Sequence, residues 1–378
     1  MTGLLLNARF LMRAPTGVDR VAEQLVGALV DLGLPPGFDA FHGLRPQGDI
    51  VLPEERPKAV TDALEAPKSS LKGHAWEQFY LARTRPDDWM LSLCNTGPVL
   101  RKRQIVMIHD AQVFRQPESY SKPFRLWYNA MQPRLGRTAQ VVLTVSEHSK
   151  SELERFGVVP PGKARVIPNG ADHILRIKPD DTTIKRHGLT SGRYLLALGS
   201  LAPHKNLAML VAAARARKDR SVPLVIAGGG NAAIFSDNGI TASDDVRLLG
   251  RVSDAELRAL YDNAAALVFP SLTEGFGLPP AEAMFCGCPV IASTGGAIPE
   301  VCGDATISLD PSDRDGWTAA MEDLCANTER RTRLSEAGRI RVQQFTWRAA
   351  AEKLAGILSD LPRTSAGQSS TAPANGTV

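Results

Sequence analysis

The sequence has few cysteines, few aromatic residues and almost no excess of charge of either sign. Its five cysteines are odd in number and include no C-x-x-C pair, so neither a zinc finger nor a closed disulfide framework is expected. Reduced thiols in a cytoplasmic protein explain them best. Lys and Arg number 44 against 40 Asp and Glu. So weak a basic excess gives no reason to expect nucleic acid as a partner, although it is compatible with an anionic ligand.

Long apolar runs are also missing. A membrane-spanning helix needs at least about 18 consecutive apolar residues, and no segment approaches that length. Arg9 and Arg13 interrupt the first apolar stretch, which therefore does not have the pattern of a signal peptide. Any membrane contact is expected to be peripheral, on the inner face of the membrane.

What the sequence does contain is a repeated alternation of short apolar runs and helical patterns. This alternation predicts the α/β class, with parallel sheets covered by helices. A polar stretch without apolar period, around residues 171–192, separates two such sets, so we expect two Rossmann-like domains facing each other across a cleft. The predicted strands are residues 4–6, 89–93, 104–108, 140–145 and 164–167 in the first set, and 194–198, 224–227, 246–248, 266–269 and 290–292 in the second.

The predicted organisation has five parts. An N-terminal domain at 1–172 is followed by an interdomain connection at 173–191 and a C-terminal domain at 192–345. Residues 346–361 should form a helix that braces the two domains, because apolar residues recur on one face of it. Residues 362–378 are rich in Ser, Thr, Gly and Pro and are expected to be a disordered tail.

Three short motifs resemble known sites but stand in unsuitable surroundings. Residues 157–163 have the spacing of a phosphate loop, but Ala164 stands where Ser or Thr is required. Residues 228–233 fit a dinucleotide-binding turn without its usual acidic residue. A tight turn is the simpler interpretation, although a turn that lines a nucleotide stays open. Asp313 and Asp315 form the only D-x-D, and we expect a helix cap there and not a metal-held diphosphate.

The segment EGFGLPPAE at 274–282 combines features of an anion site with two carboxylates. Gly275 and Gly277 let backbone N–H groups approach a ligand closely, and a helix beginning beside them favours an anion. That effect is worth only about 0.3–1 kcal/mol, so a side-chain cation should assist it. Glu274 is expected at the start of the loop and Glu282 in the first helical turn. These carboxylates would repel a phosphate unless they faced hydroxyls. A nucleotide sugar has a diphosphate in the middle and sugar hydroxyls at both ends, so it suits both the anion site and the carboxylates. The simpler alternative is that Glu274 is only an acidic loop residue and that Glu282 only stabilises the helix dipole.

This E-x7-E segment resembles the signature of the retaining family 4 glycosyltransferases, also called glycosyltransferase group 1, which have the GT-B fold. Further motifs of that family occur in the same order along nearly the whole chain, at residues 15–18, 109–110, 145–149, 168–170 and 198–207. The resemblance implies an acceptor-side N-terminal domain and a nucleotide-sugar-binding C-terminal domain. It also implies a reaction without a cofactor or metal.

The resemblance further assigns roles by position. His109, Glu274 and Lys205 would be catalytic, with His109 facing the transferred sugar, Glu274 holding its hydroxyls and Lys205 neutralising the diphosphate. Glu282 would hold the ribose. His204 and Ser200 stand where relatives often carry Arg, so the donor site should be less cationic. The remaining predicted donor contacts are Gly17, Gly250, Arg251, Gly275, Phe276, Gly277 and Leu278.

The implied reaction moves a hexose from a nucleotide sugar to a glycan or polyprenyl-linked acceptor in surface or exopolysaccharide synthesis. We favour mannose from GDP-mannose, with UDP-glucose and dTDP-rhamnose as alternatives. An NAD-dependent oxidoreductase and a non-catalytic nucleotide-sugar-binding protein are more remote possibilities. Residues 124–137 mix aromatics with arginines, as a membrane-surface helix does, although a partly buried helix is the simpler interpretation. The candidate acceptor residues are Trp76, Glu77, Asn95, Thr96 and Asp110.

Overall fold

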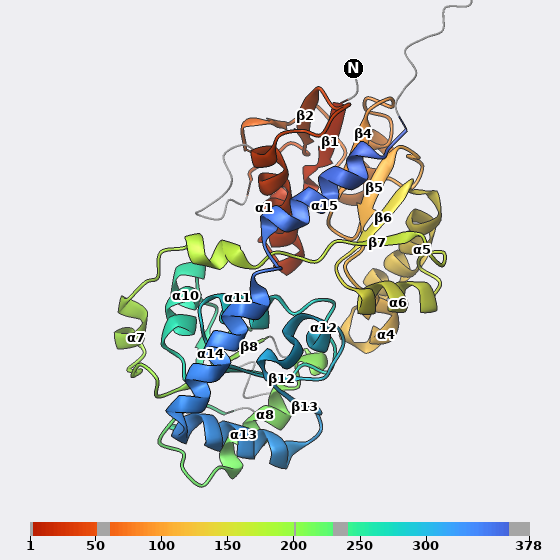
Figure 1. Ribbon diagram of the computed structural model, residues 1–378. Helices are drawn as coiled ribbons and strands as arrows, with labels where there is room; N and C mark the ends of the chain where they lie inside the picture. The colour runs from red at the N-terminus through yellow and green to blue at the C-terminus, as the bar shows by residue number, and fades with distance from the viewer. Residues whose placement is uncertain (1–2, 51–60, 200–201, 230–240, 363–378) are drawn as a thin grey trace, which may run out of the picture.

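Two parallel β-sheets, each covered by helices, make up the protein (Figure 1). The computed structural model describes residues 3–50, 61–199, 202–229 and 241–362. Ser200, most of the turn at 228–233 and nearly all of the predicted tail therefore lie outside the described residues. We call the parts built around the first and second sheet the N-lobe and the C-lobe. The two-sheet α/β architecture predicted from the sequence is confirmed.

The N-lobe sheet has seven strands and the C-lobe sheet has six, and every neighbouring pair of strands is parallel. The first sheet has the order β3-β2-β1-β4-β5-β6-β7, with β1 Gly3–Asn7, β2 Ala40–Leu44, β3 Leu64–Glu65, β4 Trp89–Ser92, β5 Gln104–Met107, β6 Val141–Thr144 and β7 Ala164–Val166. The second has the order β10-β9-β8-β11-β12-β13, with β8 Leu195–Leu198, β9 Leu224–Ala227, β10 Val246–Gly250, β11 Ala266–Phe269, β12 Val290–Ser293 and β13 Ile307–Leu309.

Three of these strands, β2, β3 and β13, were not predicted. The strands found from sequence are continuous apolar runs because both of their faces are buried. In contrast, β2 and β13 are only partly buried and carry polar residues, and β3 has two residues. Such strands near the edge of a sheet have no distinctive apolar pattern.

The helices that matter most for the site are α1 Gly17–Leu32, α6 Glu147–Arg155, α10 Asp254–Asn263, α11 Leu278–Phe285, α12 Ile298–Cys302 and α15 Trp347–Ser359. The other α-helices are α3 Gly73–Ala75, α4 Gln112–Arg115, α5 Lys122–Thr138, α7 Thr182–Arg186, α8 Leu207–Ala216, α13 Arg314–Ala326 and α14 Thr328–Val342. A π-helix, η2 Trp76–Leu81, and the 3-10 segments η1 Ala8–Met12, η3 Pro117–Ser119, η4 Asp172–Arg176, η5 Pro203–Lys205 and η6 Gly303–Ala305 complete the description. Within the described ranges, no helix is long and apolar enough to cross a membrane.

The chain passes from the N-lobe to the C-lobe at η4 and returns at the start of α15, and the two passages touch. The N–H of Ala171 donates to the carbonyl of Phe345 at 2.9 Å, and the N–H of Trp347 donates to Asp172 at 2.7 Å. After the return, α15 lies across α1 of the N-lobe (Figure 1). Its apolar residues join one buried cluster that extends from the first sheet into the C-lobe.

Candidate active site

The loop at 274–277 lies where the two lobes meet. The carbonyl of Gly275 accepts hydrogen bonds from the Ser146 and Ser149 hydroxyls at 2.6 and 3.0 Å, both at the start of α6 in the N-lobe. A Cβ at Gly275 would lie 3.1 Å from the carbonyl oxygen of His109, so a side chain would disturb this approach. The absence of a side chain at Gly275 therefore allows the close contact between the lobes, in addition to any close approach of a ligand.

The loop ends in a left-handed residue, Gly277, with φ of 102°, and α11 begins at Leu278. Glu282 is therefore the fifth residue of the helix, and the expectation that it lies in the first turn was wrong. Gly17 of the N-lobe lies opposite, since a Cβ there would be 4.0 Å from the Leu278 side chain.

The backbone N–H groups of Gly275, Phe276 and Gly277 donate no hydrogen bond to another described residue. The Phe276 side chain is buried and packs edge-on against Phe345, with ring centroids 5.5 Å apart. Any contact from Phe276 to a ligand must therefore come from its backbone.

A charged cluster borders the loop on one side. The Nζ of Lys205 lies 2.7 Å from the Oε1 of Glu274. Burial raises the pKa of Asp110, and the nearby Glu274 charge adds to the rise. Burial and the charge of Lys205 lower the pKa of His204, whose Nδ1 is buried without a partner among the described residues. With His204 neutral, Lys205 still provides a positive charge at this end of the site.

Glu282 lies in α11, the helix that follows the loop, and is buried, with 4% of its surface exposed. It accepts a hydrogen bond from the Tyr261 hydroxyl at 3.1 Å and lies 3.2 Å from the Nε2 of His173 and 4.0 Å from Arg20. Burial acts to raise the pKa of Glu282, but the contacts with His173, Arg20 and Tyr261 outweigh it and lower the pKa. The carboxylate is therefore ionised at neutral pH.

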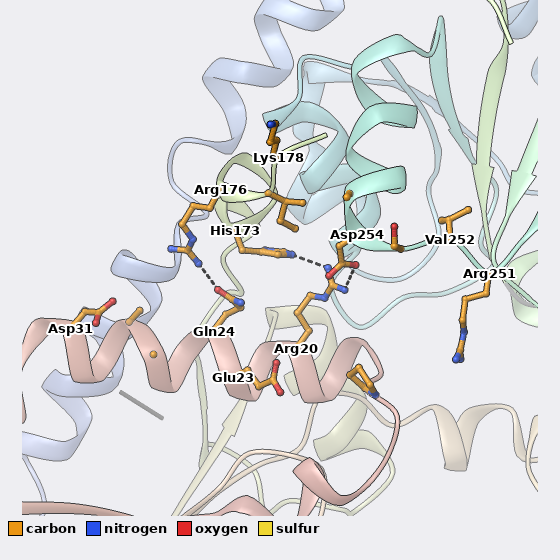
Figure 2. A pocket seen from close by; sticks show the side chains of 16 residues that line it. Arg20, Glu23, Gln24, Asp31, His173, Arg176, Lys178, Arg251, Val252 and Asp254 are labelled. Carbon is orange, nitrogen blue, oxygen red and sulfur yellow. Dashed lines mark hydrogen bonds and ion pairs between the residues drawn. The ribbon is translucent and has the colours of Figure 1, made fainter. Parts of the chain in front are cut away.

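A cavity of about 790 Å³ opens between the lobes (Figure 2), and it is lined by Arg20 and His173, the partners of Glu282, but not by Glu282 itself. It is bounded by α1, η4 and the loop that precedes α10. Arg20 of α1 reaches across it to Asp254 of α10, at 2.5 Å. Of the predicted donor residues, Arg251 lines the cavity, whereas Lys205 and the 274–278 loop do not. Other lining residues include Pro15, Glu23, Gln24, His173 and Arg176.

His109 is 5% exposed, and its Nε2 lies 2.8 Å from the carbonyl of Leu93. A carbonyl oxygen only accepts, so Nε2 carries the hydrogen and Nδ1 has a free lone pair. Burial lowers the pKa of His109 to about 4, which leaves the ring neutral at pH 7. If His109 faces the transferred sugar as predicted, it does so as an uncharged imidazole.

Among the acceptor candidates, three are enclosed by the N-lobe. Trp76 is fully buried against Tyr80 and belongs to the core, so its prediction as a residue of the cleft was wrong. Glu77 and Thr96 are also buried and bond to each other at 2.9 Å. They form an internal network with Asn7 and Arg9, neither of which was predicted.

Asn95 and Asp110 are partly exposed and remain available to an acceptor. Asn95 has a left-handed backbone, with φ of 63°, and its side-chain oxygen accepts the N–H of His109 at 2.8 Å. Asp110 accepts the N–H of Gln112 at the start of α4, at 2.9 Å. Both residues therefore lie beside the His109 loop.

The lobes are also joined by a residue that the sequence did not single out. Glu300 of α12 accepts the N–H groups of Glu147 and His148 at 2.9 and 3.1 Å. These N–H groups belong to the N-terminus of α6, where a carboxylate is favourable. A Glu after a Pro in the first turn of a short helix gives no local sign of such a partner, so only the packing of the lobes identifies it.

The D-x-D forms the cap that was predicted. The Asp313 carboxylate accepts the N–H of Gly316 at 3.0 Å, at the N-terminus of α13. Within the part of the chain that the structure describes, no group of three His, Cys, Asp or Glu residues could hold a metal ion.

Both halves of the chain match models of known protein families. Residues 15–174 match the family described as Glycosyltransferase Family 4, and residues 180–341 match Glycosyl transferases group 1. The chain is 33% identical to MMP alpha-(1->4)-mannosyltransferase of Mycolicibacterium hassiacum over 69% of its length, and 31% identical to O-antigen chain mannosyltransferase B of Escherichia coli over 65%. It spans 62% and 67% of these two relatives.

Solved structures share the fold at lower identity. Sucrose-phosphate synthase from Thermosynechococcus elongatus is 20% identical, with a TM-score of 0.70 over 95% of this chain and 98% of that one. Anabaena HepE in complex with UDP and glucose is 19% identical, with a TM-score of 0.71 over 96% of this chain and 100% of that one. The predicted GT-B fold is thereby confirmed.

Proposed function

The chain belongs to the family 4, or group 1, glycosyltransferases, and we propose that it transfers a hexose from a nucleotide sugar to a glycan or polyprenyl-linked acceptor. The observation that carries the proposal is the arrangement around the 274–277 loop. Backbone N–H groups that donate to no other described residue follow Glu274, which pairs with Lys205, and precede the helix that carries Glu282. This order suits a diphosphate with a hydroxyl-bearing sugar at each end.

The cavity supports a place for the nucleoside. Glu282 does not itself line the cavity, but it contacts Arg20 and His173, which do, so a ribose in the cavity would lie next to the partners of the carboxylate. The base would then extend toward Gly250 and Arg251, and the diphosphate would lie over the loop toward Lys205. Glu274 and the neutral His109 would face the transferred sugar.

We propose that the sugar keeps its anomeric configuration, without a protein nucleophile or a metal. The leaving phosphate would accept the proton of the acceptor hydroxyl on the same face as the new bond. Lys205 would stabilise the charge that grows on that phosphate, an electrostatic contribution that is often the largest in catalysis. Because Lys205 already pairs with Glu274, donor binding would share this cation between the carboxylate and the diphosphate.

Mannose is the favoured sugar and GDP-mannose the favoured donor. Both relatives described above are named mannosyltransferases, and a third, from Mycolicibacterium smegmatis, is 31% identical and is named as GDP-mannose-dependent. The Asp254 carboxylate lines the cavity. Guanine presents two neighbouring N–H donors to such a group, whereas uracil and thymine present one.

The acceptor side supports peripheral contact with a membrane. Leu126 of α5 is 75% exposed and Leu100 is 78% exposed. Exposed Lys122, Arg134 and Arg137 lie on the same helix as Leu126, and cations beside apolar side chains favour an anionic lipid surface. A lipid-linked acceptor would be presented at such a surface. The inner half of α5 is buried, as the simpler interpretation of this helix predicted.

Thermal unfolding with GDP, UDP, dTDP, ADP and NADH, each added separately, tests the proposal. A ligand at 100 times its Kd stabilises the folded state by about 2.7 kcal/mol, so the matching nucleoside diphosphate should raise Tm measurably. Glu282→Ala should abolish that rise. A response to NADH alone would favour an oxidoreductase, and the absence of any response to the diphosphates would overturn the proposal. Binding without transfer or donor hydrolysis would favour a non-catalytic binding protein.

Asp313→Ala should leave the rate of transfer unchanged, because the Asp313 carboxylate serves as the cap of α13. Loss of the cap should cost about 1 kcal/mol of stability. The rate should also withstand a chelator such as EDTA. A variant without activity, together with a requirement for Mn²⁺, would contradict the metal-free reaction.

A further inference from the structure

Three segments from different parts of the chain meet at the Glu282 carboxylate. Trp347 begins α15, His173 lies in η4 and Glu282 lies in α11. The indole Nε1 of Trp347 is 3.0 Å from Nδ1 of His173, and Nε2 of His173 is 3.2 Å from Oε1 of Glu282. The exposed fractions of these three residues are 1%, 3% and 4%. The row is therefore almost entirely buried, although His173 also lines the cavity.

The chemistry of the row fixes the hydrogen on the imidazole. An indole N–H can only donate, so Nδ1 of His173 must accept and carries no hydrogen. The ring hydrogen is then on Nε2, where it is donated to Glu282. Arg20 also lies 3.2 Å from Nε2, but it finds no acceptor there in this tautomer and is held by Asp254 at 2.5 Å.

The same row limits how Glu282 can bind a ligand. A carboxylate can accept about four hydrogen bonds. His173 takes one position on Oε1 and the Tyr261 hydroxyl takes one on Oε2, at 3.1 Å. One position on each oxygen is left, which is what the two neighbouring hydroxyls of a ribose require.

We propose that His173 and Trp347 are positioning residues, which orient the Glu282 carboxylate toward the ribose of the donor. This inference rests on the proposed function, since it needs a nucleotide in the cavity. Trp347 sets the tautomer of His173, and His173 holds one oxygen of Glu282. Both residues lie where the chain passes between the lobes, and the N–H of Trp347 is tied to Asp172 at 2.7 Å. A movement of the lobes therefore also moves the support of the carboxylate.

The test is calorimetric titration of the full chain with GDP, UDP and dTDP, and with inorganic pyrophosphate as a ligand that has no ribose. Trp347→Phe and His173→Leu should weaken binding of the matching nucleoside diphosphate about 10- to 100-fold, the range typical of residues that orient a ligand-binding group. Pyrophosphate affinity should stay within about threefold of the wild-type value. His173→Gln should restore nucleotide affinity, because its amide can accept from the indole and donate to the carboxylate.

Trp317→Phe is the matched control. Trp317 is also fully buried, and its N–H donates to the carbonyl of Asp310 at 2.9 Å in the C-lobe helix α13. Its loss should lower Tm without changing nucleotide affinity. Equal weakening of nucleotide and pyrophosphate binding in the His173 and Trp347 variants would overturn the inference, as would wild-type affinity in both. If the wild-type chain bound pyrophosphate but no nucleoside diphosphate, the proposed function would fail first, and the positioning role with it.

Discussion

Replacing Lys205 with Ala is expected to slow sugar transfer about 10²- to 10³-fold. Lys205 lies beside the loop that would hold the diphosphate, and the neighbouring His204 is half-buried with a lowered pKa. Removing a group that stabilises a developing negative charge typically costs a rate factor of this size. Initial rates with the matching nucleotide sugar, measured at saturating donor, give the effect directly.

Lys353→Ala supplies the comparison for Lys205, because Lys353 is an exposed lysine on α15. It should transfer sugar at the wild-type rate. The Lys205 variant also leaves Glu274 without its partner, so Glu274→Gln in the same background tests whether the unpaired carboxylate contributes to the loss. A Lys205→Ala enzyme within twofold of the wild-type rate would show that the diphosphate does not lie at this loop.

Gly170→Ala is expected to destabilise the fold by about 3 kcal/mol or more. A Cβ at this position would lie 2.2 Å from the backbone nitrogen of Trp347 and 2.6 Å from the carbonyl carbon of Thr346. Overpacking costs about 1–3 kcal/mol where side chains can move, and backbone atoms cannot move aside so easily. The midpoint of thermal unfolding, followed by circular dichroism, measures the loss.

Gly356→Ala, in contrast to Gly170→Ala, is expected not to destabilise the fold. Gly356 lies within α15, and a Cβ there would meet no atom within 4 Å. Alanine favours a helix over glycine by about 1 kcal/mol, so this variant should be slightly more stable than the wild type. If both variants unfolded at the wild-type temperature, the close contact between the two passages would not exist in solution.

The fold was largely predictable because parallel strands buried on both faces leave continuous apolar runs, as in β5 and β11. The site was predictable only where its chemistry is local. The spacing of Glu274 and Glu282 and the glycines between them belong to one loop and one helix. Their partners are not local. Arg20 comes from α1, His173 from a connection without apolar period, and Tyr261 from α10.

Several residues predicted to bind the acceptor are buried inside the N-lobe. A polar or aromatic residue near a predicted strand end can point to a ligand or into the lobe, and its sequence neighbours do not decide which. Trp76, Glu77 and Thr96 point inward. Only the packing of η2 against β1 and β4 shows this, through the bond of 2.7 Å between Asn7 and Glu77. The Phe276 side chain is a similar case, since its ring fills the core beside Phe345.

The position of α15 has a consequence for synthesis on the ribosome. The apolar face of α1 is translated long before α15, yet Leu354 and Leu358 of α15 belong to the same buried cluster and are made only after the whole C-lobe. Until then the apolar face of α1 lacks the cover of α15, and apolar surface exposed in this way favours aggregation. Translation that stopped before Trp347 would leave that surface uncovered.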